Sequence, residues 1–162
     1  MSFTVVLILV IAGGIVLDQA TKLIVANTME LYQSVDVIPR VLRLTYIRNR
    51  GAAFGMLDNH RWVFISISTV AIIAISIYLF RYCKEGRLFK LGLALIVSGG
   101  IGNMIDRVIL GYVIDMIDFC PFDFWVWIFN VADSLVCVGA GIVIFALIRD
   151  IIKESRRKES RK

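Results

Sequence analysis

The sequence predicts a mainly α-helical membrane protein with four transmembrane helices and a minor β element. Of its 162 residues, 59% are hydrophobic, and the mean hydropathy is +0.81. A soluble domain usually has about 45–50% apolar residues, so this excess is too large for a small water-soluble core. A run of about 20 apolar residues spans a bilayer as a helix. The apolar residues fall into four such runs, and these runs decide the fold class.

The four apolar runs are each expected to form one helix. They cover about residues 3–26, 62–80, 88–105 and 131–148. The first run is not expected to be a cleaved signal peptide, because no basic segment precedes it and it is long for the apolar part of one. The third run is rich in glycine and other small residues, which let neighbouring helices pack closely.

Basic residues predict which ends of the helices face the cytoplasm. Short cytoplasmic loops of membrane proteins carry an excess of Lys and Arg, and such residues gather after the second run and after the fourth. Both termini are therefore expected in the cytoplasm, with outer segments at about residues 27–61 and 106–130. The residues that decide this are Arg81, Lys84, Arg87 and Lys90 in the loop, and Arg149, Lys153, Arg156, Arg157, Lys158, Arg161 and Lys162 in the tail.

We expect one domain over residues 1–150, followed by a basic cytoplasmic tail over residues 151–162. A basic tail also occurs in nucleic-acid-binding proteins. A tail that directly follows an apolar run more often marks the cytoplasmic face of a membrane, and four apolar runs exclude a soluble nucleic-acid binder. Membrane lipids, and not nucleic acid, are the expected partners.

The first outer segment is too long for a simple turn and contains a predicted strand. Residues 41–47 alternate in polarity and are rich in β-forming types, which predicts a short strand or hairpin. The second outer segment ends in aromatic residues, which settle at the membrane–water interface. Arginines in the first outer segment weaken the charge bias and predict contact with lipid headgroups or an anionic partner. They are Arg40, Arg43, Arg48, Arg50 and Arg61.

Polar residues near the helices predict one site that opens outward. Ionisable groups at membrane depth are costly and usually functional. Those of this chain all fall near the outward ends of the first, third and fourth runs, so a common site at one depth is expected. They are Asp18, Lys22, Asn103, Asp106, Arg107, Asp115, Asn130 and Asp133.

Two pairs within this set have both a functional and a structural interpretation. Asp18 and Lys22 are four residues apart and share a helix face. They contact substrate, or they form an ion pair that ties the first helix to the others. Asn103 and Arg107 also share a face. Arg107 can hold a carboxylate or a substrate carbonyl, or belong to a structural network at a helix end.

Asp115 and Asp133 are the candidates for a catalytic pair. Asp133 lies near the start of the fourth helix, where the helix dipole favours an ionised carboxylate. If the two carboxyl groups meet, repulsion and desolvation make them share one proton. One then takes a proton from water while the other donates one to the scissile peptide. Spacing alone leaves Asp118 and Asp123 as alternatives.

Other chemistries lack the residues that they need. The only histidine is His60 in a polar loop, on which a Ser-His-Asp triad would depend entirely. The one lysine at the depth of the site, Lys22, already has Asp18 beside it. There is no HExxH motif, and the cysteines Cys83, Cys120 and Cys137 form no CxxC pair. No metal or cofactor is expected, and the cysteines are interpreted as buried or lipid-facing filler.

A non-enzymatic alternative is a small transporter or membrane scaffold that uses Asp18, Asp106 and Asp133 as an ion path. A transporter needs polar groups through the full depth of the membrane. The second run and the inner halves of the third and fourth offer almost none beyond small hydroxyls. This distribution disfavours conduction.

Five short motifs make the sequence resemble the bacterial lipoprotein signal peptidase family, also called signal peptidase II. The motifs occur in the family's order, and the resemblance covers essentially the whole chain except the tail. They are residues 18–22 (DQATK), 49–55 (NRGAAFG), 99–107 (GGIGNMIDR), 113–115 (VID) and 129–133 (FNVAD).

The resemblance implies four transmembrane helices and a small extracytoplasmic β-sheet platform in the bacterial inner membrane. It implies that Asp115 and Asp133 are the catalytic dyad, near the outer leaflet. The implied substrate is a prolipoprotein whose lipobox cysteine carries diacylglycerol, cut just before that cysteine by a monomer without cofactor. The implied substrate-binding or supporting residues are Asn49, Asn103, Arg107 and Asn130, with Asp18, Lys22 and Asp106 close by and Gly51 in a loop that acts as a lid or clamp.

One position departs from the family's pattern. Phe usually follows the first catalytic aspartate, whereas Met116 follows Asp115 here. The pair Asp118-Phe119 imitates the motif three residues later, so Asp118 is the reserve assignment. Asp115 is preferred because Val113 precedes it and because it stands nine residues after Asp106, as the family's spacing suggests. Met is apolar and flexible, so it can fill a Phe site.

Overall fold

The computed structural model describes residues 2–50, 61–120 and 127–159, except for the side chains of residues 61 and 64. Within these ranges the fold is mainly helical with a small antiparallel sheet, which confirms the predicted fold class. The helices are α1 (Phe3–Thr28), α2 (Arg61–Ile77) with its π-helical continuation η2 (Tyr78–Tyr82), α3 (Arg87–Ile109) and α4 (Val131–Glu159). The strands are β1 (Ser34–Ile38), β2 (Leu42–Asn49), β3 (Val113–Phe119) and β4 (Ile128–Phe129).

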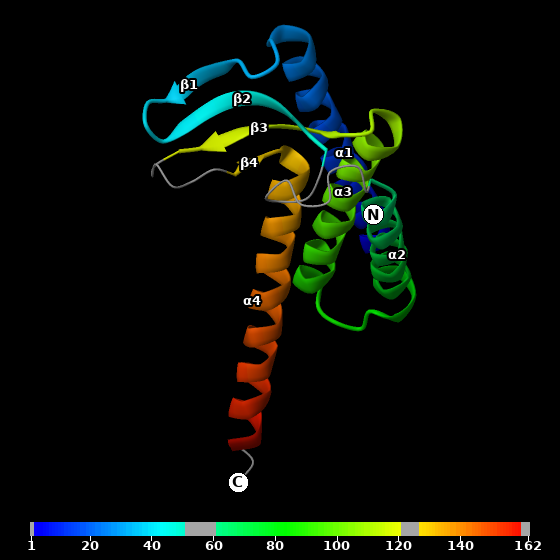
Figure 1. Cartoon of the computed structure of the whole chain (residues 1–162). Helices are drawn as coiled ribbons and strands as arrows, with labels where there is room; N and C mark the ends of the chain where they lie inside the picture. The colour runs from blue at the N-terminus through cyan, green and yellow to red at the C-terminus, as the bar shows by residue number, and fades with distance from the viewer. Residues whose placement is uncertain (1, 51–60, 121–126, 160–162) are drawn as a thin grey trace.

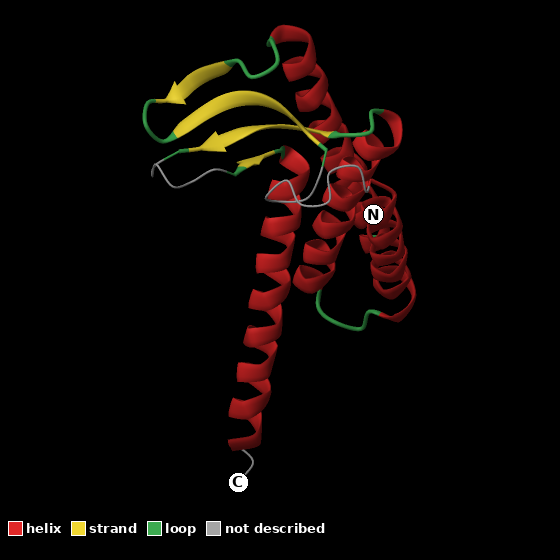
Figure 2. Cartoon of the chain, in the orientation of Figure 1, coloured by secondary structure: helices red, strands yellow, loops and turns green. Residues whose placement is uncertain are grey.

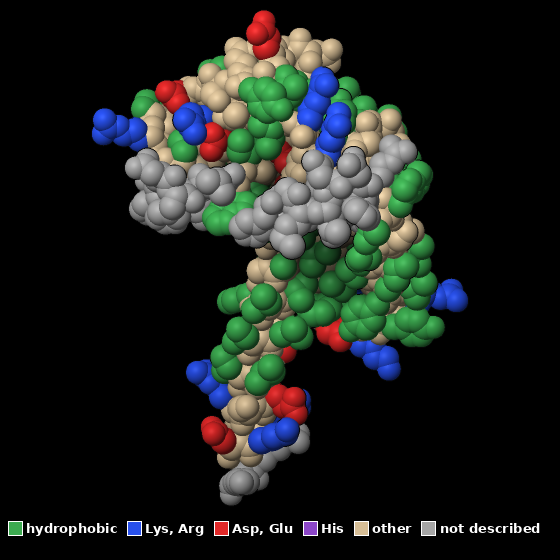
Figure 3. Space-filling model, viewed as in Figure 1, with side chains coloured by type: hydrophobic (Ala, Val, Ile, Leu, Met, Phe, Trp, Pro, Cys, Tyr) green, Lys and Arg blue, Asp and Glu red, His purple; other side chains and the backbone are tan. Residues whose placement is uncertain are grey.

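Four helices of this structure are long and apolar enough to cross a membrane, and they coincide with the four predicted runs. Their outward faces carry exposed Leu, Ile and Val side chains, for example Leu17 and Val70. Figure 3 shows these apolar side chains along the helical part of the molecule, with charged side chains towards its two ends. Lipid can cover such a surface, because a spanning helix satisfies its own backbone hydrogen-bonding groups and leaves only apolar side chains exposed. Helix α4 continues to Glu159, so residues 151–159 of the predicted tail are helical.

Helix α3 is the centre of the bundle and packs against α1, α2 and α4. Its small residues permit this. Gly92 of α3 and Gly139 of α4 face each other so closely that a Cβ atom on Gly139 would lie 2.6 Å from the Gly92 carbonyl oxygen. A Cβ atom on Gly102 would lie 2.5 Å from Asp18 Oδ2 of α1. The predicted close packing of the third run is therefore present.

The four strands form one antiparallel sheet in the order β1-β2-β3-β4. The sheet lies across one end of the helices, and the loop before α3 and the C-terminal end of α4 lie at the other end (Figures 1 and 2). The strand predicted over residues 41–47 is confirmed as β2. The local pattern predicts only a short strand or hairpin, whereas the resemblance implies a small sheet. The sheet is present, because β3, which lies in the second outer segment, pairs with β2.

The two faces of the sheet have different environments. Side chains alternate between faces along a strand, so Met116 and Asp115 point to opposite sides. Met116 is 2% exposed and packs with Ile114, Tyr46 and Val25, the last from the C-terminal part of α1. The site that follows Asp115 is therefore apolar, and the Met116 side chain fills it.

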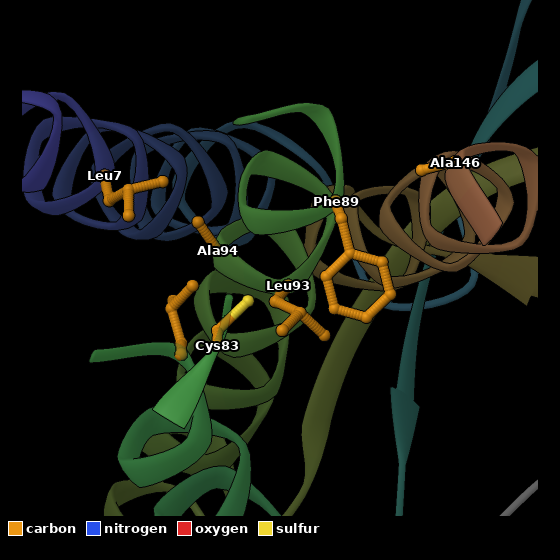
Figure 4. Close-up of a cluster of buried hydrophobic side chains, with 7 residues drawn as sticks. Leu7, Cys83, Phe89, Leu93, Ala94 and Ala146 are labelled. Atoms are coloured by element: carbon orange, nitrogen blue, oxygen red, sulfur yellow. The ribbon is translucent and has the colours of Figure 1, made fainter. Parts of the chain in front are cut away.

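A separate apolar cluster lies towards the opposite end of the helices (Figure 4). It joins α1, η2, α3 and α4, and it includes the Cys83 thiol. Burial raises the pKa of this thiol, as expected for a cysteine that serves as apolar filler. The buried members are Leu7, Leu79, Cys83, Phe89, Leu93, Ala94 and Ala146.

Candidate active site

Asp115 lies in the middle of β3, on the face of the sheet opposite Met116, and is 2% exposed. Asn49, from the paired strand β2, donates from Nδ2 to Asp115 Oδ2 at 3.0 Å. Asn130 donates from Nδ2 to Asp115 Oδ1 at 2.6 Å. Burial raises the pKa of Asp115 to about 6, although both amides and the charge of Lys22 oppose the shift. A carboxyl group with such a pKa can hold or release a proton near neutrality.

Asp133 lies in the first turn of α4 and forms a reciprocal cap with Asn130. The Asp133 N–H donates to Asn130 Oδ1 at 2.9 Å, and the Asn130 N–H donates to Asp133 Oδ2 at 3.2 Å. This arrangement satisfies two donors at the helix start that would otherwise lack partners. The other oxygen, Oδ1, accepts from Asn103 Nδ2 at 2.7 Å. The orientation of the Asp133 carboxylate is therefore fixed by the helix end itself.

Asn130 connects the two aspartates. Its side chain is 0% exposed. Its Oδ1 accepts from the Asp133 backbone, while its Nδ2 donates both to Asp115 Oδ1 and to Asn103 Oδ1, the latter at 3.0 Å. A carboxamide has two N–H donors and one carbonyl acceptor, so both ends of this group are engaged. Asp115 and Asp133 are 18 residues apart in the sequence, and both form hydrogen bonds with Asn130.

A buried lysine lies behind this pair. Lys22 of α1 is 1% exposed. Its ammonium group contacts Asp18 Oδ2 at 2.9 Å, Asp106 Oδ2 at 3.0 Å and Asn103 Oδ1 at 3.0 Å. The predicted ion pair between Asp18 and Lys22 is thus present, and it extends to α3 through Asp106.

Gln19 was missed by the sequence analysis. Its Nε2 lies 3.1 Å from Asp18 Oδ2, 3.0 Å from Asp106 Oδ1 and 3.2 Å from the Gly102 carbonyl oxygen. An amide within an apolar run, directly beside a buried aspartate, was the signal that could have found it. Gln19 braces the two carboxylates that flank Lys22.

Arg107 lies on α3 one turn after Asn103. Its Nη1 donates to the Asn103 carbonyl oxygen at 3.3 Å, and its charge acts on Asp133, Asp115 and Asp106. The predicted neighbourhood of Arg107 and the aspartates is present. Among residues 2–50, 61–120 and 127–159, no group of three His, Cys, Asp or Glu side chains could hold a metal ion.

Comparison with known proteins identifies the family. The family model described as Signal peptidase (SPase) II matches residues 8–149. The chain belongs to the signal peptidase II family. The resemblance that the five motifs predicted is therefore confirmed.

Curated relatives of this signal peptidase II chain are similar over most of their length. A lipoprotein signal peptidase of Halalkalibacterium halodurans is 43% identical over 146 residues, which cover 90% of this chain and 94% of the relative. A lipoprotein signal peptidase of Geobacter metallireducens is 45% identical over 152 residues, which cover 91% and 93%. The chain is thus a peptidase by family.

Solved structures agree with the fold of this signal peptidase II member. Two structures described as bacterial membrane enzymes are 36% identical to it and superpose with TM-scores of 0.83 and 0.82. Each covers 90% of this chain, which covers 89% and 94% of theirs. Together with the four helices able to span a membrane, these neighbours support a multi-pass membrane protein.

The reserve assignment, Asp118, lies on the other face of the sheet from Asp115. Its Oδ2 accepts from Thr45 Oγ1 at 2.9 Å and pairs with Arg43 Nη2 at 2.8 Å. In this signal peptidase II chain the sheet therefore separates Asp118 from Asp133 and Asn130. Gly51, Asp123 and His60 lie outside the residues that the structure describes.

Proposed function

We propose that this chain removes the signal peptides of prolipoproteins whose lipobox cysteine carries diacylglycerol, and that it cuts just before that cysteine. The relatives' activity as lipoprotein signal peptidases supports the substrate class. The observation that carries the mechanism is the hydrogen bonding of Asn130 to both Asp115 and the start of α4 at Asp133. We therefore assign Asp115 and Asp133 as the catalytic dyad of an aspartic peptidase.

The dyad works with one shared proton. The ionised carboxylate takes a proton from a water molecule, whose oxygen attacks the scissile carbonyl carbon. The protonated carboxyl group gives its proton to the carbonyl oxygen, which produces a neutral tetrahedral diol. When the C–N bond breaks, a proton from the dyad passes to the leaving amine of the cysteine, and one diol hydroxyl returns its proton to the dyad. No covalent intermediate with the protein forms.

The surrounding amides and cation hold this arrangement. Asn49 and Asn130 orient the two oxygens of Asp115, and Asn103 orients Asp133. Arg107, whose charge reaches both aspartates, is suited to a substrate carbonyl or carboxylate. Preorganised donors of this kind stabilise charge that develops in a transition state.

The position of the dyad suits a lipid-anchored substrate. Each CH₂ group buried in the bilayer contributes about 0.8 kcal/mol, so a diacylated cysteine stays at the membrane. Asp115 lies in β3 and Asp133 in the first turn of α4. Figure 1 shows the sheet and the start of α4 at the same end of the bundle. We place this end at the outer leaflet of the bacterial inner membrane, with both termini in the cytoplasm, and expect the monomer to suffice.

The described polar network favours hydrolysis over ion conduction. Asp18, Lys22, Asp106 and the dyad all gather at the sheet end of the bundle. The buried cluster towards the other end consists of apolar side chains around Cys83. A conducting path would need polar groups through that cluster.

The proposal is tested with a lipobox peptide that carries diacylglyceryl cysteine and with the same peptide bearing a free thiol. Purified protein in detergent should release the lipidated product with cysteine at its N-terminus, as identified by mass spectrometry. The thiol peptide should be cut at least tenfold more slowly, because it lacks the anchor. Failure to cut the lipidated peptide, or cleavage at another bond, would contradict the proposal.

The cleavage rate should fall as the pH rises through about 6. Burial raises the pKa of Asp115 to about 6, so above this pH the dyad loses the proton that serves as acid. The charged groups that act on Asp115 are Lys22 from α1 and Asp133 from α4, and Arg107 from α3. A profile of kcat/KM between pH 4.5 and 8.5 checks this, because kcat/KM reports the ionisation of the free enzyme. A rate that stays constant from pH 5 to 8 would contradict the assignment.

A further inference from the structure

The three N–H donors of Lys22 all have partners, and each partner leads to an aspartate of the dyad. Lys22 contacts Asp18 and Asp106, which lie on α1 and α3, and the amide oxygen of Asn103. An ammonium group has three donors, so this set uses every one. Asn103 then donates to Asp133 Oδ1 at 2.7 Å. Asn103 therefore links Lys22 to Asp133 through two successive hydrogen bonds.

Each carboxylate beside Lys22 also holds a backbone N–H next to the dyad. Asp106 Oδ2 accepts from the Ile114 N–H at 3.0 Å, and Ile114 directly precedes Asp115. Asp18 Oδ1 accepts from the Ala132 N–H at 2.9 Å, and Ala132 directly precedes Asp133. One carboxylate therefore fixes the start of β3, and the other fixes the start of α4. The sheet that contains β3 and the start of α4 lie at the same end of the bundle in Figure 1.

We infer that Lys22 is a positioning residue that sets the separation of the two catalytic carboxylates by holding Asp18 and Asp106 together. The inference rests on the proposed function, since it concerns the dyad assigned there. Gln19 reinforces the same contact, because its amide lies within hydrogen-bond distance of both carboxylates. The position of each aspartate of the dyad then depends on a hydrogen bond from the preceding backbone N–H group. The acceptors of these two bonds, Asp106 and Asp18, share the Lys22 ammonium group.

Stability alone does not explain this arrangement. Two carboxylates and one ammonium bury a net negative charge, and desolvation of buried ions offsets much of their attraction. Apolar side chains of similar volume often stabilise a core equally well. The cluster of Lys22, Asp18 and Asp106 instead provides directional contacts, because its hydrogen bonds fix specific atoms next to the two aspartates of the dyad. A displacement of about 1 Å at such a residue can lower a rate about 100-fold.

The test uses a neutral version of the cluster. Lys22→Met alone leaves two unpaired buried carboxylates and can prevent folding, so it is combined with Asp18→Asn and Asp106→Asn. This triple variant should fold, with a kcat about 100-fold below the parent and a KM within threefold of it. A kcat within threefold of the parent would overturn the inference.

A second readout does not depend on cleavage. Amide hydrogen exchange by NMR should become faster at Ile114 and Ala132 in the triple variant, with little change at Tyr46 of the same sheet. Unchanged exchange at both amides would overturn the inference even if activity fell. If the parent failed to cut the lipidated peptide, the proposed function would fail, while the exchange result would still decide the positioning role.

Asp118→Asn is the matched control. It breaks a carboxylate contact with Arg43 on the opposite face of the strand that carries Asp115. Its kcat should stay within threefold of the parent. A loss of kcat as large as that of the triple variant would assign the effect to general disturbance of the sheet and overturn the inference.

Discussion

Asp115→Asn and Asp133→Asn are each expected to abolish cleavage while leaving the protein folded. A neutral amide can neither take a proton from water nor donate one to the scissile peptide. General acid and base catalysis contributes about 10²- to 10⁴-fold, and residues that act as a unit lose nearly their whole effect when one is removed. We expect kcat for the lipidated peptide to fall about 10,000-fold in either variant, and no further in the double variant.

The fold should survive because asparagine keeps one carbonyl oxygen in place of the carboxylate. That oxygen can still accept from Asn130 at position 133, or from one of the two amides at position 115. Thermal unfolding in detergent should confirm that both variants are folded. Asp118→Asn, on the opposite face of β3, should retain activity. Parental rates in both dyad variants would end the assignment of an aspartic mechanism.

Asn130→Asp is the second large effect that we expect, with kcat about 1,000-fold lower. Aspartate caps a helix as well as asparagine does, so the acceptor for the Asp133 N–H is preserved. The substitution removes the donor to Asp115 and adds a third carboxylate against it. Loss of one such donor costs about 10²- to 10³-fold at other active sites, and repulsion adds to this loss.

Steady-state kinetics and thermal unfolding should be compared for Asn130→Asp and for Asn27→Asp. Asn27 is exposed on the last turn of α1, where its side chain donates to the Leu23 carbonyl oxygen. The same chemical change there should leave kcat within about twofold of the parent. A normal rate for Asn130→Asp would show that its amide does not organise the dyad.

The helices were predictable from sequence because apolar length alone specifies a membrane span. Strand β3 was not, because its partner β2 lies about 70 residues earlier and its own sequence contains Asp115 and Asp118. Local pattern could not separate these two acids. The alternation of side chains along β3 separates them, since residues three apart in a strand face different sides of the sheet.

The residues of the candidate site also differed in how far the sequence could predict them. The pair of Asp18 and Lys22 was visible because its members are one helical turn apart. Asn49 carries no local signal, because its partner Asp115 is 66 residues away. It was anticipated only through the family motif that contains it. Gln19 escaped notice because two of its three contacts, to Gly102 and Asp106, depend on how α1 packs against α3.

The double role of Asn130 limits which side chains can replace it without loss of the activity that we propose. This residue both starts α4 and joins the two carboxylates. An inhibitor that makes its polar contacts with Asn130, Asp115 and Asp133 would bind groups whose replacement also costs turnover.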